Sequence, residues 1–139
     1  MNTWGTFAAV AVGAALTLTG CNIRPSNEEE TRTALREHAA GVLERFGRTI
    51  DRASSPEDLE QRIKGFPTLY AFAWDDDMEP VADVYLQQYA GRGGGWWAQD
   101  YRVKACVRYS VDAGERVMKS VDCPSARQFD EHAEVVPIP

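Results

Sequence analysis

The chain has 139 residues, of which 44% are hydrophobic and 26% are charged, and its net charge is −6. A chain of this length and composition is typical of one small folded domain. Acidic proteins are repelled by phosphate polymers and by anionic lipid headgroups, so we do not expect this chain to bind nucleic acid.

The N-terminal segment predicts export from the cytoplasm. The first charged residue is Arg24, and residues 7–18 (FAAVAVGAALTL) form an apolar run. A run of this length matches the hydrophobic region of a secretory signal, whereas a membrane-spanning helix needs roughly 20 apolar residues. The run leads directly into Leu18-Thr19-Gly20-Cys21, which is an aliphatic residue, two small residues and a cysteine. This pattern resembles the lipobox of bacterial lipoproteins.

The resemblance to lipoproteins implies a lipid anchor. Cys21 would carry a diacylglyceryl group, residues 1–20 would be removed as the signal peptide, and residues 21–27 would tether the domain. Two acyl chains are enough for stable membrane association, so we expect an outward-facing protein of the bacterial cell membrane. No Lys or Arg precedes the apolar run. That departure from the usual signal leaves open a retained signal anchor or a start codon further upstream.

Two helices are expected after the tether. Asn27 followed by Glu30 forms a capping box, which marks a helix N-terminus. The apolar residues that follow recur at steps of three and four, which is the spacing of one helix face: Leu35, Ala39, Val42, Phe46, Ile50 and Ala53. Ser55 and Pro56 then begin a second, short helix that Gly65 ends.

The apolar spacing changes to a period of two after residue 66. Strands are predicted over residues 68–74, 81–90, 101–112 and 116–123, joined by short turns. The third strand is the clearest, because six apolar residues occupy every second position: Tyr101, Val103, Ala105, Val107, Tyr109 and Val111.

Helices followed by strands predict the α+β class, with the long and the short helix packed on a four-stranded antiparallel meander. We assign this domain to residues 28–124 and expect an irregular tail over residues 125–139. The order of elements resembles the cystatin-like and NTF2-like folds. Order alone carries no function with it.

Cys106 and Cys123 predict one disulfide. With Cys21 taken by the lipid, they are an even pair in an oxidising compartment. A hairpin loop over residues 113–116 would set Cys106 opposite Cys123, whereas a tighter loop would set it opposite residue 121. In either register the bond is expected on the open, polar face of the sheet. The alternative is a reactive or metal-binding thiol pair.

Two groups of residues are candidates for contact with a ligand or partner. Trp96 and Trp97 follow a glycine-rich segment and could form a contact patch, or one could cap the core. Tyr85 and Tyr89 could share a sheet face with the cations of the next strand, Arg102, Lys104 and Arg108. Such a face would suit an anionic or glycan-like ligand or a protein, although ordinary cross-strand pairs explain the same residues.

No catalytic residue, metal site or cofactor is predicted. Asp75, Asp77 and Glu79 alternate as in calcium loops, but Pro80 stands where an EF-hand needs glycine, so a solvated turn is expected. His38 is expected to pack at the edge of the helix stripe. No hydrolase or metalloprotease motif occurs in the chain.

The sequence therefore predicts a membrane-anchored extracytoplasmic lipoprotein that acts as a binding or accessory module of the cell envelope, with an envelope protein as its partner. The alternative is a small-ligand carrier or an enzyme with a pocket between helix and curved sheet. In that case His38 or Asp83 would line the pocket.

Overall fold

The computed structural model describes residues 27–90 and 101–139. Its elements are α1 (Asn27–Arg52), α2 (Pro56–Lys64), β1 (Leu69–Trp74), β2 (Pro80–Ala90), β3 (Tyr101–Asp112), β4 (Glu115–Val121), the 3-10 turn η1 (Arg127–Phe129) and β5 (Glu134–Val135). The α+β class and the antiparallel order β1-β2-β3-β4 are confirmed. None of the helices in the described ranges is long and apolar enough to cross a membrane.

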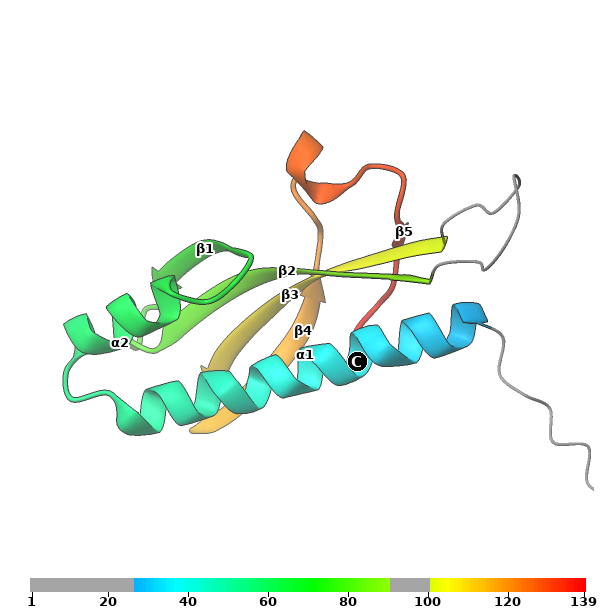
Figure 1. The fold of residues 1–139 in the computed structure, drawn as a ribbon. Helices are drawn as coiled ribbons and strands as arrows, with labels where there is room; N and C mark the ends of the chain where they lie inside the picture. The colour runs from blue at the N-terminus through cyan, green and yellow to red at the C-terminus, as the bar shows by residue number, and fades with distance from the viewer. Residues whose placement is uncertain (1–26, 91–100) are drawn as a thin grey trace, which may run out of the picture.

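The helix α1 lies along one face of the sheet, and the segment that carries η1 rises on the other face (Figure 1). The apolar stripe predicted for this helix forms the contact, because Leu35, Ala39 and Phe46 are fully buried. Alternate residues of the strands meet them, among them Val84 and Val107. Each buried Leu, Val or Phe side chain of this set stabilises the fold by about 1.5–3 kcal/mol relative to its exposed state. The core thus lies between α1, β2 and β3.

The short helix α2 begins and ends where its sequence predicts. The hydroxyl of Ser55 accepts a hydrogen bond from the Asp58 amide at 3.2 Å, and Pro56 occupies the first turn, where its missing N–H costs nothing. The Gly65 amide donates to the Arg62 carbonyl at the other end. Leu59 anchors the helix in the core.

The hairpin between β3 and β4 corrects one expectation. Ala113 and Gly114 form a two-residue turn, with φ angles of 49° and 82°. Positive φ at both central positions is the geometry whose twist matches that of the flanking strands. Cys106 therefore pairs with Val121 and not with Cys123, so the longer loop is wrong and the tighter alternative is right.

The Cys106–Cys123 disulfide is present, with 5.2 Å between the two Cα atoms. Because Cys123 lies beyond the end of β4, the bond ties the chain that follows this strand back to the centre of β3. Its expected place on an open face is wrong. Cys106 is only 1% exposed, because Phe129 covers it together with Tyr85.

The C-terminal residues, expected as an irregular tail, contain little regular structure but belong to the packed domain. Phe129, Val136 and Ile138 are all buried. The short strand β5 pairs in parallel with residues 103–104 of β3, beyond the point where β4 ends. The segment crosses from one face of the sheet to the other and packs single apolar side chains on each. Such packing leaves no periodic pattern in the sequence.

Candidate functional site

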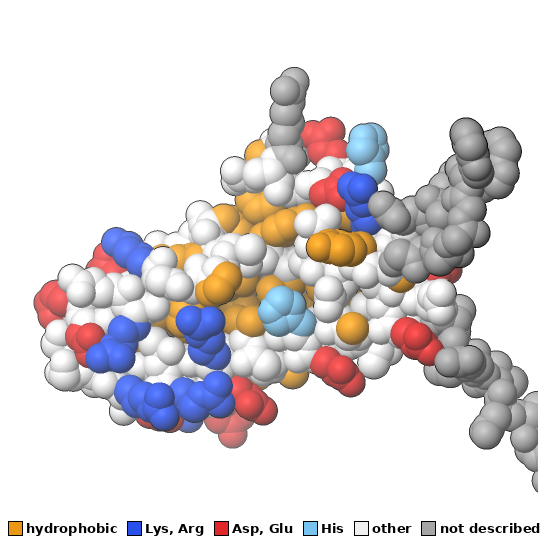
Figure 2. Space-filling view, viewed as in Figure 1, with side chains coloured by type: hydrophobic (Ala, Val, Ile, Leu, Met, Phe, Trp, Pro, Cys, Tyr) orange, Lys and Arg blue, Asp and Glu red, His pale blue; other side chains and the backbone are white. Residues whose placement is uncertain are grey.

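A groove runs between α1 and the neighbouring edge of β2. Two hollows, of about 210 and about 280 Å³, follow one another along this line. We call them together the edge groove. Its α1 side is formed by Asn27, Glu30, Thr31, Ala34, His38, Val42 and Arg45, its β2 side by residues 85–90, and its far end by Phe66, Pro67 and Thr68. Figure 2 shows hydrophobic side chains gathered above α1 on this face of the molecule.

The β2 edge in this groove has no neighbouring strand among the described residues. Pairing with β1 ends at Leu69 and Val84. Just before that pair, Thr68 has a φ of 59°, a left-handed conformation that is costly for a β-branched residue and turns the chain away from β2. The last contact is the Tyr85 amide donating to the Thr68 carbonyl at 3.0 Å.

Alternation along a strand fixes which backbone groups point into the edge groove. The Tyr85 amide faces the β1 side of β2, so the amides and carbonyls of Gln87 and Tyr89 face the same side. No described strand pairs with them there. A sheet edge of this kind presents donors and acceptors that another chain can use.

Four arginines surround the far end of the groove. A third hollow, of about 420 Å³, lies there and is lined by Arg45, Arg48, Thr49, Arg52, Arg62 and Phe66. We call its arginines the arginine cluster. The Arg45 guanidinium lies 4.7 Å from the centre of the Phe66 ring, and both residues border the edge groove as well. Lys and Arg side chains gather where α1 meets α2 (Figure 2). Of the residues that the structure describes, no Asp or Glu lines this hollow, although the whole chain is acidic.

Two of these arginines have partners outside the hollow. Arg48 lies 3.5 Å from Glu44, and Arg62 lies 2.7 Å from Asp58, each one helical turn away. Exposed pairs of this type are weak and easily exchanged. An anion in the hollow would therefore meet a positive field.

Of the predicted contact residues, Tyr85, Tyr89, Arg102 and Arg108 share the sheet face opposite α1. In the β2–β3 register Tyr89 pairs with Arg102, and Asp83 pairs with Arg108. The Arg108 guanidinium donates two hydrogen bonds of 2.7 Å to the Asp83 carboxylate, and these bonds raise the pKa of Arg108. Asp83 therefore serves this ion pair and is absent from the edge groove.

The C-terminal segment covers part of this face. Tyr85 is 8% exposed, and its ring meets that of Phe129 edge-on at 5.1 Å. Burial raises the pKa of Tyr85, and its buried hydroxyl has no hydrogen-bond partner among the described residues. The Lys104 ammonium donates to the carbonyls of Phe129 and Asp130 at 2.9 and 2.7 Å. Tyr85 and Lys104 therefore stabilise the fold, whereas Tyr89 is 72% exposed and is the open aromatic group among the described residues of this face.

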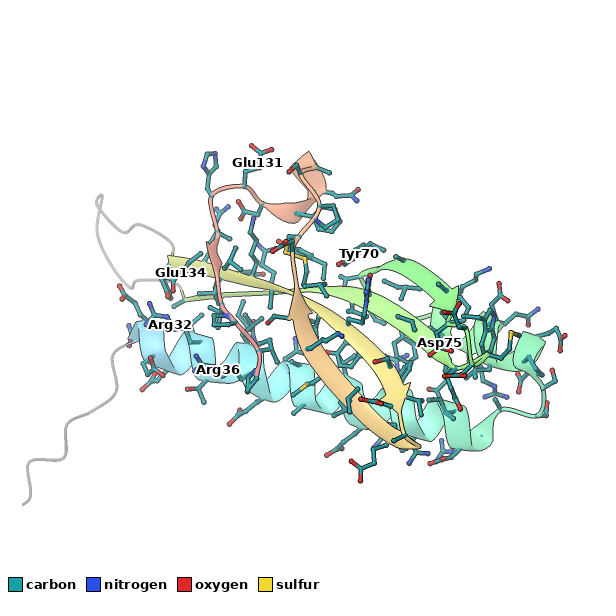
Figure 3. The ribbon with its side chains drawn as sticks, turned by 180° about the vertical axis from the view of Figure 1, so that it is seen from behind. Arg32, Arg36, Tyr70, Asp75, Glu131 and Glu134 are labelled. Carbon is teal, nitrogen blue, oxygen red and sulfur yellow. A yellow bond between two sulfur atoms is a disulfide. The ribbon has the colours of Figure 1, made fainter. Side chains whose placement is uncertain are left out.

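A second tie joins the same segment to α1. The Arg32 guanidinium donates to the Glu134 carboxylate at 3.0 and 3.2 Å (Figure 3). The Tyr101 hydroxyl donates to the same carboxylate at 2.8 Å. The arginine's hydrogen bond is the main reason that the pKa of Glu134 lies below its usual value. Desolvation, followed by the bond to Glu134, raises the pKa of Tyr101 to about 12.

Other predicted positions can be placed or set aside. Cys21, Trp96 and Trp97 lie outside the described residues. His38 is exposed at the margin of the edge groove, so its expected packing is wrong. The Asp75 carboxylate accepts hydrogen bonds from the amides of Asp77 and Glu79 at 3.0 and 2.8 Å, so it stabilises the turn between β1 and β2.

Sequence reasoning missed the edge groove, although a signal was present. The first predicted strand was shorter than the second, so part of the second had to lack a neighbour on that side. Pro67 supported this reading, because a proline before a strand has no N–H with which to extend the ladder. The arginines that gather there lie on two helices, and their meeting depends on how α2 packs.

Comparison of the chain with protein-family models, with curated proteins and with solved structures found no match. Within residues 27–90 and 101–139, no three His, Cys, Asp or Glu side chains gather as a metal site would require. The described part of the groove combines a row of backbone donors and acceptors, an apolar floor and a cationic end.

Proposed function

We propose that this protein is a lipid-anchored, outward-facing module of the bacterial cell envelope that binds another envelope component through the edge groove. The lipobox pattern at residues 18–21 supports the anchor. The Cys106–Cys123 disulfide supports an oxidising compartment. The observation that carries the binding role is the edge of β2 beside α1, which pairs with no other strand in the described part of the chain.

The anchor and the groove have a useful relative position. The helix α1 has 26 residues, which corresponds to about 39 Å of length. Its first residue, Asn27, follows Cys21 by a tether that reaches roughly 20 Å when extended. The arginine cluster lies toward the other end of α1, at the far end of the helix from the residue that follows the tether.

A small-ligand carrier is the second candidate function. The hollow of about 210 Å³ between α1 and β2 supports it, because His38 contributes to its lining. Pockets for small molecules usually measure about 300–1,000 Å³ and enclose their ligand. The smaller volume and the elongated course of the edge groove favour an extended partner.

The anchor is tested by the intact mass of the protein from the membrane fraction of its own host, before and after reduction and alkylation. We expect loss of residues 1–20, an added lipid mass, and two thiols that appear only after reduction. A full-length mass with three free thiols would contradict the lipoprotein assignment and would return Cys106 and Cys123 to the list of reactive residues.

A further inference from the structure

We infer that the edge groove binds the C-terminal segment of a partner polypeptide, which adds to β2 as an antiparallel strand and places its terminal carboxylate at the arginine cluster. The inference rests on the proposed role as a binding module, and it is independent of the lipid anchor. It names the occupant of the groove as an extended peptide with a free C-terminus.

The backbone of β2 supplies the first reason. Gln87 and Tyr89 each direct one amide and one carbonyl into the groove. A peptide strand lying there would satisfy these groups, as in other proteins that bind peptides by strand addition. Side chains at alternate positions of the peptide would face α1, where Val42, Phe66 and Leu86 offer an apolar hollow.

The path of β1 supplies the direction and the end. An antiparallel strand on β2 runs in the same direction as β1 and lies in line with it. The peptide would therefore advance toward Pro67 and Thr68, where β1 already occupies the edge of β2. Because the way forward is closed, the chain in the groove has to end or leave at this point.

The charges along the groove indicate that the peptide ends at this point, and they favour the antiparallel direction over the parallel one. The closed end of the groove is bordered by Arg45, and the arginine cluster continues behind it. The opposite end of the groove is lined by Glu30. A peptide that runs antiparallel brings its carboxylate to the cations and keeps it away from Glu30. A parallel peptide would bring its ammonium group to the arginines and its carboxylate toward Glu30, and both contacts join like charges.

The test uses the full chain in detergent and two libraries of random octapeptides, one displayed with free C-termini and one with free N-termini. We expect enrichment of peptides from the library with free C-termini only. A selected peptide, made with a fluorescent label, should lose roughly tenfold or more in affinity when its C-terminus is amidated, because a charge-assisted contact disappears. Equal binding of the amidated peptide, or enrichment in neither library, would overturn the inference.

Matched variants locate the site. Arg45→Ala should weaken binding by roughly tenfold, whereas Arg36→Ala should not, because residue 36 lies on the opposite side of α1, as Figure 3 shows from behind. His38→Trp fills the groove from an exposed position and should abolish binding. Ala40→Trp adds the same side chain at an exposed position on the far side of the helix. Binding that survives His38→Trp, in a variant with unchanged thermal unfolding, would refute the site.

Strand addition itself is tested with N-methylated peptides. Methylation of amides that would face β2 should remove binding, while methylation of the intervening amides should not. If the mass measurement fails but the peptides bind as described, only the anchor is wrong. If the anchor is found but no free C-terminus is preferred, the peptide-binding inference fails and the envelope assignment remains.

Discussion

Arg108 and Asp83 face each other across β2 and β3, and the two side chains differ strongly in exposure. Their bidentate contact has two distances of 2.7 Å, and the side chains are 41% and 10% exposed, respectively. Arg108 can therefore reach water if its partner is lost, whereas Asp83 cannot. Their contributions to stability should be unequal.

We expect Arg108→Leu to lower the free energy of unfolding by about 2 kcal/mol, because it leaves a nearly buried carboxylate without its partner. Asp83→Leu should cost less, since the remaining guanidinium turns to solvent. Urea unfolding of the two variants measures the difference. Arg48→Leu breaks an exposed pair with Glu44 and should stay within about 0.5 kcal/mol of the wild type. An equal loss for both members of the Asp83–Arg108 pair would contradict the asymmetry.

We expect the disulfide to stabilise the whole domain and, in particular, the segment that follows β4. It closes a loop with a sequence separation of 17 residues, for which loss of the cross-link costs roughly 3 kcal/mol. Reduction should also expose residues 122–133 to proteolysis, since the bond holds this segment against β3. The measurement is the thermal midpoint, together with the sites of limited cleavage, with and without reductant. The Cys106→Ala/Cys123→Ala variant should behave like the reduced protein, and an unchanged cleavage pattern would count against this role.

Phe129 packs the C-terminal segment against the sheet. Its ring lies edge-on to those of Tyr70 and Tyr85, at 5.3 and 5.1 Å between ring centres. Phe129→Ala should reduce the free energy of unfolding by about 3 kcal/mol through the cavity that it leaves. Tyr89→Ala, on an exposed ring of the same face, is the control and should be nearly neutral. Chemical denaturation distinguishes the two outcomes, and equal losses would refute the fastening role.

Tyr109 should make stability fall at alkaline pH. Its hydroxyl donates to the Ala39 carbonyl at 3.1 Å, and burial raises the pKa of Tyr109 far above the usual value of about 10. Between these two values the unfolded chain loses a proton that the folded chain keeps, so the free energy of unfolding decreases as the pH rises above about 10.

We expect Tyr109→Phe to cost about 1 kcal/mol at neutral pH, through the lost hydrogen bond, and to show a shallower decline above about pH 10. Unfolding curves from pH 8 to pH 11 provide the slopes. Tyr101, whose pKa is raised to about 12, also adds to the decline above about pH 10, but it does so in both proteins, so the difference between their slopes reports Tyr109. Tyr89→Phe, at an exposed ring, is the control. If the free energy of unfolding of Tyr109→Phe declined with pH as steeply as that of the wild type, a group other than Tyr109 would be responsible for the decline.

The backbone at Thr68 is strained, and a glycine at this position would relieve the strain. Its φ of 59° is unfavourable by roughly 1–2 kcal/mol for a residue with a Cβ, and the greater flexibility of glycine offsets part of any gain. Thr68→Gly should therefore raise the free energy of unfolding by up to about 1 kcal/mol, as measured by urea denaturation. Thr49→Gly, inside α1, is the contrasting variant and should destabilise by about 1 kcal/mol. A clear loss of stability in Thr68→Gly would mean that its side chain supports the turn.

The sequence by itself determined the secondary structure and the pairing of cysteines. The helix stripe that includes Leu35 and Phe46 and the strict alternation of residues 101–112 are local patterns, since each follows from the geometry of one element. The order of helices and strands then predicted the α+β class. The short turn at Ala113 and Gly114 could have been chosen over the longer loop, because glycine favours positive φ.

Only the tertiary structure decided which surfaces remain open. The sheet face with Asp83, Tyr85 and Arg108 looked available, yet the aperiodic C-terminal segment covers part of it, with Phe129 packed against Tyr85. The edge groove arises because the chain turns at Thr68 before β1 can extend along β2, and because Arg45 and Arg62, from different helices, meet at its end. Such features depend on contacts between residues far apart in the chain, which no local pattern of side chains encodes.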